Sequence, residues 1–143
     1  MVEDPDRRGR PRGNQAGTGR RRAGPGHHQP WHGNSIVLYE ERDGTWVRRV
    51  IEDQLSEGHA LGWGDFDGDG DDELAVGWRR GKFGVALYKR DRAGTWQRAL
   101  MVDDGGMATE DLAVADLDGD GRPEIVAAGR ATGNVKIYWN ESS

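Results

Sequence analysis

The chain has 143 residues, a formal net charge of −5 and no cysteine. The length suits a single domain, and the lack of cysteine excludes disulfide bonds and cysteine-ligated zinc sites. Glycine is frequent, with 23 residues, and no stretch of helical length carries an apolar stripe that is free of glycine. The composition therefore predicts an all-β fold.

Residues 1–30 differ in composition from the rest of the chain. They contain seven arginines, three acidic residues and six glycines, and no apolar run has the length of a signal peptide or a membrane span. Such a segment cannot bury a core, so we predict that residues 1–30 are disordered and that residues 31–143 form the folded blades. The alternative is a basic arm that contacts nucleic acid or an anionic surface. No aromatic residue stands between the arginines to stack on bases, so we expect no nucleic-acid binding.

Two nine-residue acidic loops, at 65–73 and 116–124, share the pattern Asp-x-Asp-Gly-Asp-Gly-x-x-Glu. Carboxylates at loop positions 1, 3, 5 and 9, a glycine at position 6 and a backbone carbonyl at position 7 supply the oxygen ligands that Ca²⁺ needs. The predicted ligands are the side chains of Asp65, Asp67, Asp69, Glu73, Asp116, Asp118, Asp120 and Glu124, with the carbonyl groups of Asp71 and Arg122. We therefore predict two Ca²⁺ sites. The alternative is a pair of solvated Asp-Gly turns, but the six acidic residues of 65–73 would repel one another in a bare turn.

The acidic loops belong to a repeat. They start 51 residues apart, and the triplets Val-Leu-Tyr, Ala-Leu-Tyr and Lys-Ile-Tyr recur at nearly the same period, at 37–39, 86–88 and 136–138. A period near 50 residues indicates stacked or radially arranged units. Within one unit we predict strands at 60–64, 74–78, 85–89 and 97–102. Four antiparallel strands per unit form a β-propeller blade.

The predicted blades are too few for a closed propeller. Residues 31–143 supply the last two strands of one blade, all four of a second and the first three of a third, whereas closed propellers have about four to eight blades. We therefore expect a fragment of a larger propeller, with about two to three blades. Such a fragment needs the missing blades or self-association to cover its sheet edges and apolar faces.

Residues 65–78 and 116–129 resemble the calcium loop and following strand of FG-GAP/VCBS-type propeller repeats, which also occur in integrin alpha-chain heads and many secreted bacterial proteins. The resemblance covers about 31–140 and departs from the family in two ways. Gly-Trp-Arg and Ala-Gly-Arg, at 77–79 and 128–130, replace the Gly-Ala-Pro of the family. Position 9 of each loop carries Glu where the family often has Asp, which leaves a bidentate carboxylate available. The resemblance implies an extracellular or periplasmic location.

A second group of candidate residues is predicted at the end of the blades opposite the acidic loops. The strand order places His32, His59, Glu110, Arg79 and Arg130 there, and these side chains could hold a second divalent metal and an anionic or polyhydroxylated ligand. Residues 105–135 faintly resemble the propeller part of aldos-2-ulose dehydratase-type proteins, which implies a metal-dependent lyase acting on keto-sugars. On that resemblance His32, His59 and Glu110 would be metal ligands or acid/base groups. The alternative is that these are ordinary surface and hydrogen-bonding residues.

The tryptophans have two interpretations. Trp46 and Trp96 follow Gly-Thr at equivalent repeat positions, and Trp63 and Trp78 lie in predicted strands. They could stack on a sugar, but recurrence at the repeat period favours packing between blades. We therefore predict a calcium-stabilised binding or scaffold module with a protein or carbohydrate ligand and no membrane span. A sugar lyase is the alternative, so whether the chain is an enzyme stays open.

Overall fold

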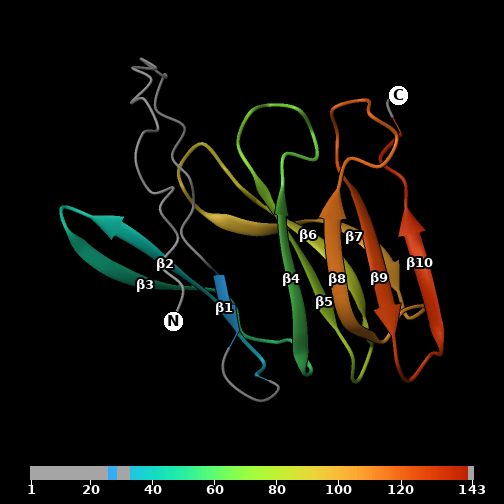
Figure 1. Cartoon of the computed structure of the whole chain (residues 1–143). Helices are drawn as coiled ribbons and strands as arrows, with labels where there is room; N and C mark the ends of the chain where they lie inside the picture. Colours follow the sequence, from blue (N-terminus) through green and yellow to red (C-terminus); the bar gives the residue numbers. More distant parts are fainter. Residues whose placement is uncertain (1–25, 29–32, 142–143) are drawn as a thin grey trace, which may run out of the picture.

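The computed structural model describes residues 26–28 and 33–141, and within them the chain is all-β (Figure 1). The strands are β1 (Gly26–His28), β2 (Ile36–Arg42), β3 (Thr45–Glu52), β4 (Gly58–Gly64), β5 (Glu73–Trp78), β6 (Gly84–Arg90), β7 (Trp96–Asp104), β8 (Thr109–Ala115), β9 (Glu124–Gly129) and β10 (Asn134–Tyr138). The predicted strands at 60–64, 74–78, 85–89 and 97–102 are confirmed as β4 to β7, each a little longer than predicted. None of the described residues belongs to a helix that is long and apolar enough to cross a lipid bilayer.

The strands form three antiparallel sheets in the order of propeller blades. The first sheet has the order β1-β2-β3, the second β4-β5-β6-β7 and the third β10-β9-β8, and Figure 1 shows them side by side. In the second sheet each strand pairs with the next one along the chain, so this sheet is a complete four-stranded blade. The prediction of one full blade followed by three strands of another is confirmed, whereas the first sheet has three described strands where the sequence predicts two.

Strand β1 departs from the predicted boundary of the folded part. Residues 26–28 lie within the segment 1–30 that composition predicts as disordered, but they pair with residues 36–38 of β2 in antiparallel register. The physical reason is that β2 pairs with β3 along one edge only and offers the backbone groups of its other edge to a further strand. The rest of the segment 1–30 lies outside the described residues.

Two apolar cores hold the three sheets together. Strand β5 is buried along its whole length because its alternating side chains point to both faces of the middle sheet. Leu74 and Val76 pack toward the first sheet, in a cluster with Ile36 and Leu38, whereas Ala75 packs toward the third sheet. The middle sheet therefore buries apolar side chains against the first sheet on one face and against the third sheet on the other.

The second and third sheets approach most closely at their first strands, β4 and β8. Strand β8 lies against β4 and also contacts β5. Glycine makes this approach possible, since a Cβ atom at Gly62 would lie 2.5 Å from a methyl carbon of Val114 and one at Gly77 would lie 2.3 Å from that of Thr109. Contact at the first strands is the radial arrangement expected for blades around an axis.

The tryptophans mostly pack between sheets, as their recurrence predicts. The rings of Trp63 and Trp96 meet edge to face with centroids 5.7 Å apart, and Trp78 is buried in the same core. Trp46 differs, because 57% of its surface is exposed although its repeat counterpart Trp96 is buried. The first sheet presents Trp46 on strand β3, which is an edge strand.

Asp103 on β7 ties the second sheet to the third. Its carboxylate accepts hydrogen bonds from Lys136 Nζ at 2.7 Å, from the Tyr138 hydroxyl at 2.7 Å and from the backbone N–H of Gly106 at 2.6 Å. Burial raises the pKa of Asp103, but the hydrogen bonds from Lys136, Tyr138 and Gly106 outweigh burial and hold the pKa below its usual 3.8.

We expect Asp103→Ala to lower the free energy of unfolding by about 1–3 kcal/mol near neutral pH, because Lys136 and Tyr138 lose their acceptor. A depressed folded-state pKa stabilises the protein above the usual value of 3.8, and this stability is lost as the pH falls through the folded-state pKa. The difference between wild type and variant should therefore shrink in acid. Urea unfolding at neutral and acidic pH measures it, with the neighbouring exposed Asp104→Ala as control. A difference that grows in acid would contradict the assignment.

Candidate metal sites at two acidic loops

The two acidic loops lie at the same end of neighbouring sheets. The first acidic loop (65–73) joins β4 to β5, and the second acidic loop (116–124) joins β8 to β9. Both are drawn at the top of Figure 1, where β4 and β8 end side by side. No helix flanks either loop, so each is a strand-to-strand connection, as the sequence predicts.

Glycines shape both loops in the same way. Gly68 and Gly70 have φ values of 76° and 93°, and Gly119 and Gly121 have φ values of 83° and 89°. These left-handed conformations occur at loop positions 4 and 6 and turn the chain around a common centre. The backbone of each loop thus favours glycine at these two positions of the Asp-Gly-Asp-Gly pattern.

The hydrogen bonds inside the two loops are also equivalent. Asp65 accepts the N–H groups of Gly68 and Gly70 at 2.8 and 2.9 Å, and Asp116 accepts those of Gly119 and Gly121 at 2.7 and 3.0 Å. Across the mouth of each loop the last glutamate accepts the N–H of the second residue, from Phe66 to Glu73 at 2.9 Å and from Leu117 to Glu124 at 2.7 Å. The same ring closure in both loops holds their carboxylates in one arrangement.

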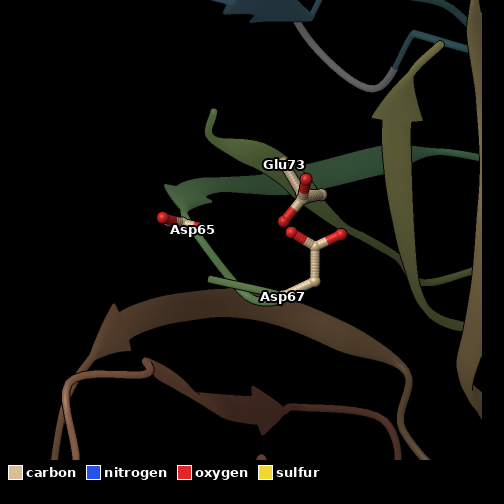
Figure 2. Close-up of side chains that lie close together, drawn as sticks. All are labelled: Asp65, Asp67 and Glu73. Atoms are coloured by element: carbon tan, nitrogen blue, oxygen red, sulfur yellow. The ribbon is translucent and has the colours of Figure 1, made fainter. Parts of the chain in front are cut away.

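Three carboxylates converge in each loop. Oxygen atoms of Asp65, Asp67 and Glu73 lie within 4.8 Å of one another, and so do those of Asp116, Asp118 and Glu124 (Figure 2). Each set joins loop positions 1, 3 and 9, which the sequence predicts as ligands. Among the described residues 33–141, these two sets are the groups of three side chains that could together hold a metal ion. Carboxylate oxygens converging in this way suit a hard cation such as Ca²⁺.

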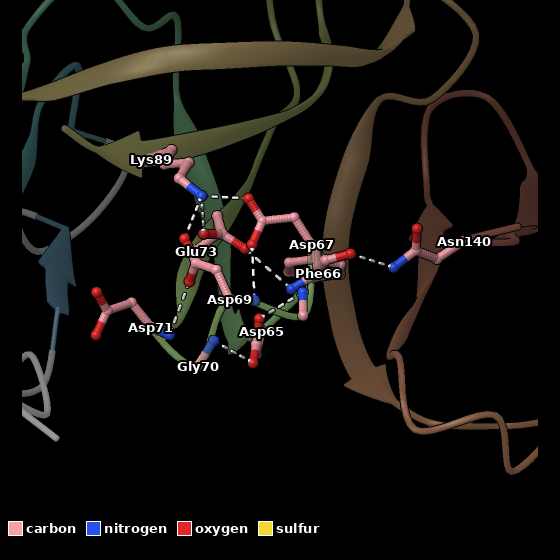
Figure 3. Close-up of polar contacts among 10 residues, drawn as sticks. Asp65, Phe66, Asp67, Asp69, Gly70, Asp71, Glu73, Lys89 and Asn140 are labelled. Atoms are coloured by element: carbon pink, nitrogen blue, oxygen red, sulfur yellow. Dashed lines mark hydrogen bonds and ion pairs between the residues drawn. The ribbon is translucent and has the colours of Figure 1, made fainter. Parts of the chain in front are cut away.

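The remaining predicted ligands lie around the same loops. Asp69 Oδ1 accepts the N–H of Asp71 at 2.9 Å, and Asp120 Oδ1 accepts the N–H of Arg122 at 2.8 Å, so position 5 braces position 7 in both loops. Figure 3 shows the carboxylate of Asp71 pointing away from the other acidic side chains. Asp71 and Arg122 therefore have only their backbone carbonyls to offer, as predicted for position 7.

Lys89 on β6 reaches into the first acidic loop. Its Nζ donates to Asp67 Oδ2 and to Asp69 Oδ2, the latter at 2.7 Å, and lies 3.5 Å from Glu73 Oε1 (Figure 3). The hydrogen bond from Lys89 lowers the pKa of Asp69, and the hydrogen bonds to Asp67 and Asp69 raise the pKa of Lys89. Burial raises the pKa of Glu73, and the lysine offsets only part of this effect. No motif of the sequence marks Lys89, because only the pairing of β5 with β6 brings it to the loop.

The second acidic loop contains a buried oxygen without a donor. Glu124 is 1% exposed, and its Oε1 has no hydrogen-bond partner among the described residues, although its Oε2 accepts from Leu117. A buried carboxylate oxygen without a partner is costly. A Ca²⁺ ion bound by Asp116, Asp118 and Glu124 would remove that cost, so the residues of this loop fit the predicted ion.

Asn140 links the two acidic loops. Its Nδ2 donates to the backbone carbonyl of Phe66 at 2.7 Å (Figure 3). The same Nδ2 lies 3.4 Å from the backbone carbonyl of Pro123. Phe66 and Pro123 belong to different loops, so one side chain braces both. No motif of the sequence marks Asn140, because its role depends on how the third sheet lies beside the second.

The opposite end of the sheets carries an ion-pair network. Arg79 Nη1 donates to both carboxylate oxygens of Glu110, at 2.9 and 2.7 Å, and Arg79 Nε donates to Glu57 at 3.0 Å. His59 Nδ1 lies 2.5 Å from the carbonyl oxygen of Glu110, which can only accept, so Nδ1 carries the proton. His59 Nε2 lies 3.9 Å from Glu110 Oε1.

The structure therefore brings three of the predicted opposite-end residues together: His59, Arg79 and Glu110. The hydrogen bond from Arg79 is the main reason that the pKa of Glu110 is lowered, and the charges of His59 and Arg130 act in the same direction. His32 lies outside the described residues. Because Arg79 binds the carboxylate of Glu110 through both oxygens, this network serves as a tie between the second and third sheets.

Comparison with known proteins agrees with this architecture. Residues 65–127 match the family model of the FG-GAP-like repeat, a segment that begins at the first acidic loop and ends in β9, beyond the second. A search of curated proteins and a search of solved structures gave no match. The matched segment, the repeated acidic loops and the blade-like sheets indicate that residues 65–127 form an FG-GAP-like repeat.

Proposed function

We propose that this β-propeller-like repeat module is stabilised by two Ca²⁺ ions and serves outside the cytoplasm as a binding or scaffold domain for a protein or carbohydrate ligand. In this proposal the ions hold the loops at one end of the blades, and the blades present surfaces that bind a partner. The chemistry of the two acidic loops supports the ions. The family resemblance supports the location.

The observation that carries the calcium proposal is the unpartnered Oε1 of Glu124. A buried carboxylate whose second oxygen has no donor in the described part of the chain suits a metal ligand better than a purely structural hydrogen-bond acceptor. The equivalent geometry of the first acidic loop, reached with a different neighbouring sequence, supports the same assignment. A solvated turn has no need for a buried glutamate at the same position twice.

The outer face of the third sheet supports the need for a partner. Val135, Ile137 and Trp139 are all exposed, whereas Val85, the repeat counterpart of Val135, is fully buried against the third sheet. Val135 and Ile137 therefore occupy the positions of Val85 and Leu87, which the third sheet covers on the second sheet. We propose that further blades or a second copy of the chain cover this face.

The ion-pair network of Arg79, Glu110 and His59, at the opposite end of the sheets, is not part of the proposed function. Glu110 is engaged by Arg79, and the three-ligand groups within 33–141 do not include His59. A lyase would need these side chains to be available to a metal or substrate.

Calcium titration tests the proposal directly. Chelator-treated protein should bind two Ca²⁺ with dissociation constants on the order of 10⁻⁵ to 10⁻³ M, the range of sensors and extracellular modules, and its melting temperature should rise. Asp65→Ala or Asp116→Ala should each remove one site, because position 1 of the loop is lost. The matched control Asp72→Ala, at the exposed position 8, should retain both sites. No binding heat together with an unchanged melting temperature would refute the proposal.

A further inference from the structure

The side chain of Lys89 contacts the carboxylate oxygens that the first acidic loop would offer to a metal ion. Asp67, Asp69 and Glu73 each use one oxygen to accept a backbone N–H, from Asp69, Asp71 and Phe66 respectively. The second oxygen of each of these three side chains is the one that faces Lys89 Nζ. The ammonium group therefore lies where three free carboxylate oxygens converge, as Figure 3 shows.

The second acidic loop has no such lysine. Leu74 on β5 pairs with Tyr88 on β6, and the equivalent Ile125 on β9 pairs with Tyr138 on β10. The residue that follows is Lys89 in the second sheet, whereas the sequence has Trp139 after Tyr138. Trp139 is largely exposed and has no cationic group, and Glu124 Oε1 is left without a partner among the described residues. The first acidic loop therefore has a lysine side chain at its carboxylate oxygens, whereas the equivalent position beside the second loop holds Trp139.

We propose that Lys89 acts as a tethered cation that occupies the first acidic loop in the Ca²⁺-free protein, so that the second acidic loop binds Ca²⁺ first and more tightly. This inference rests on the proposed function, since it orders the two sites. Ca²⁺ enters the first acidic loop only when the ammonium group leaves, because two cations within a few ångströms repel each other. Lys89 is on the surface edge of the loop with a third of its side chain exposed, so its flexible stem has water to move into.

Charge counting alone predicts the opposite order. The first acidic loop has six acidic residues, whereas the second has four and also contains Arg122. If only the net charge of the loops mattered, the first would bind Ca²⁺ more tightly. The order of filling therefore distinguishes a tethered cation from a simple effect of loop charge.

An NMR titration of the wild-type protein with Ca²⁺ gives the order directly. Each loop contains two glycine amides that donate to its first aspartate: those of Gly68 and Gly70, and those of Gly119 and Gly121. We expect the signals of Gly119 and Gly121 to shift at about tenfold lower Ca²⁺ concentration than those of Gly68 and Gly70. Simultaneous shifts, or earlier shifts of Gly68 and Gly70, would overturn the inference.

Substitution of the lysine isolates its effect. In a Glu124→Gln background, which leaves the first acidic loop as the remaining site, Lys89→Met should raise the Ca²⁺ affinity by about tenfold in calorimetry. Lys82→Met in the same background is the control, since Lys82 is exposed in the β5–β6 connection at the other end of the sheet. An unchanged affinity in the Lys89→Met variant would overturn the inference. Absence of Ca²⁺ binding in the wild-type protein would instead refute the proposed function.

Discussion

Glu124→Gln is expected to abolish Ca²⁺ binding at the second acidic loop, with a loss of affinity of about 100-fold or more, because the last loop position supplies a buried carboxylate ligand. The amide keeps an oxygen that can accept the N–H of Leu117, so the loop retains its ring closure. At a Ca²⁺ concentration 100 times the dissociation constant, an ion stabilises the folded state by about 2.7 kcal/mol. The variant should lose about this much stability in saturating Ca²⁺.

In the Ca²⁺-free protein the same substitution should have the opposite effect or none. Wild-type Glu124 buries a carboxylate oxygen that has no donor among the described residues, and an uncharged amide costs less to bury there than a carboxylate. The free energy of unfolding in chelator should therefore be equal to or higher than that of wild type. Denaturant unfolding with and without Ca²⁺ measures both values.

Glu73→Gln is the matched control for this experiment. It changes the same position of the first acidic loop, but Glu73 Oε1 lies 3.5 Å from Lys89 Nζ, so the Ca²⁺-free variant loses an attractive interaction. Because the lysine offsets part of the cost of burying Glu73, the stability of this variant in chelator should rise less than that of Glu124→Gln. If Glu124→Gln destabilised the protein equally with and without Ca²⁺, Glu124 would be a structural acceptor, and the second loop would have no metal.

Leu74→Ala is expected to lower the free energy of unfolding by about 2–5 kcal/mol, the largest loss of stability from a single apolar side chain that we expect here. Leu74 is fully buried on β5, in the cluster that joins the first sheet to the second. Truncation removes packing between the first and second sheets and leaves a cavity there that the surrounding side chains fill only in part. Because Leu74 follows Glu73 directly, Ca²⁺ binding should weaken as the loop loses its anchor.

Leu100→Ala on β7 provides the control, since Leu100 is the same residue type but is 56% exposed. Its effect on the free energy of unfolding should stay within about 0.5 kcal/mol. Equal effects of the two substitutions would mean that the cluster between the first and second sheets does not form in solution. Thermal or urea unfolding of both variants in excess Ca²⁺ makes the comparison.

The strands and the acidic loops were predictable because both are local. The apolar run of 85–88, and the turn residues that bound it, depend on neighbours in sequence, and the structure confirms β6 at Gly84–Arg90. The spacing of Asp65, Asp67 and Glu73 likewise follows from the geometry of one short loop, and the three side chains do converge. The strand β1 was missed because pairing with the open edge of β2 outweighs the composition of its segment.

The sequence by itself determined the repeat, the four-stranded unit and the candidate ligands of both loops, because these depend on side-chain type at fixed local spacing. Only the tertiary structure decided which long-range contacts form. Lys89 reaches the first acidic loop from the neighbouring strand, and Asn140 braces both acidic loops. At the opposite end, Arg79 engages Glu110 across two sheets. The physical reason is that these contacts join residues 16 or more positions apart in sequence, which strand pairing and sheet packing bring together. Such distances between residues are set by the twist and close approach of the sheets, on which local spacing carries no information.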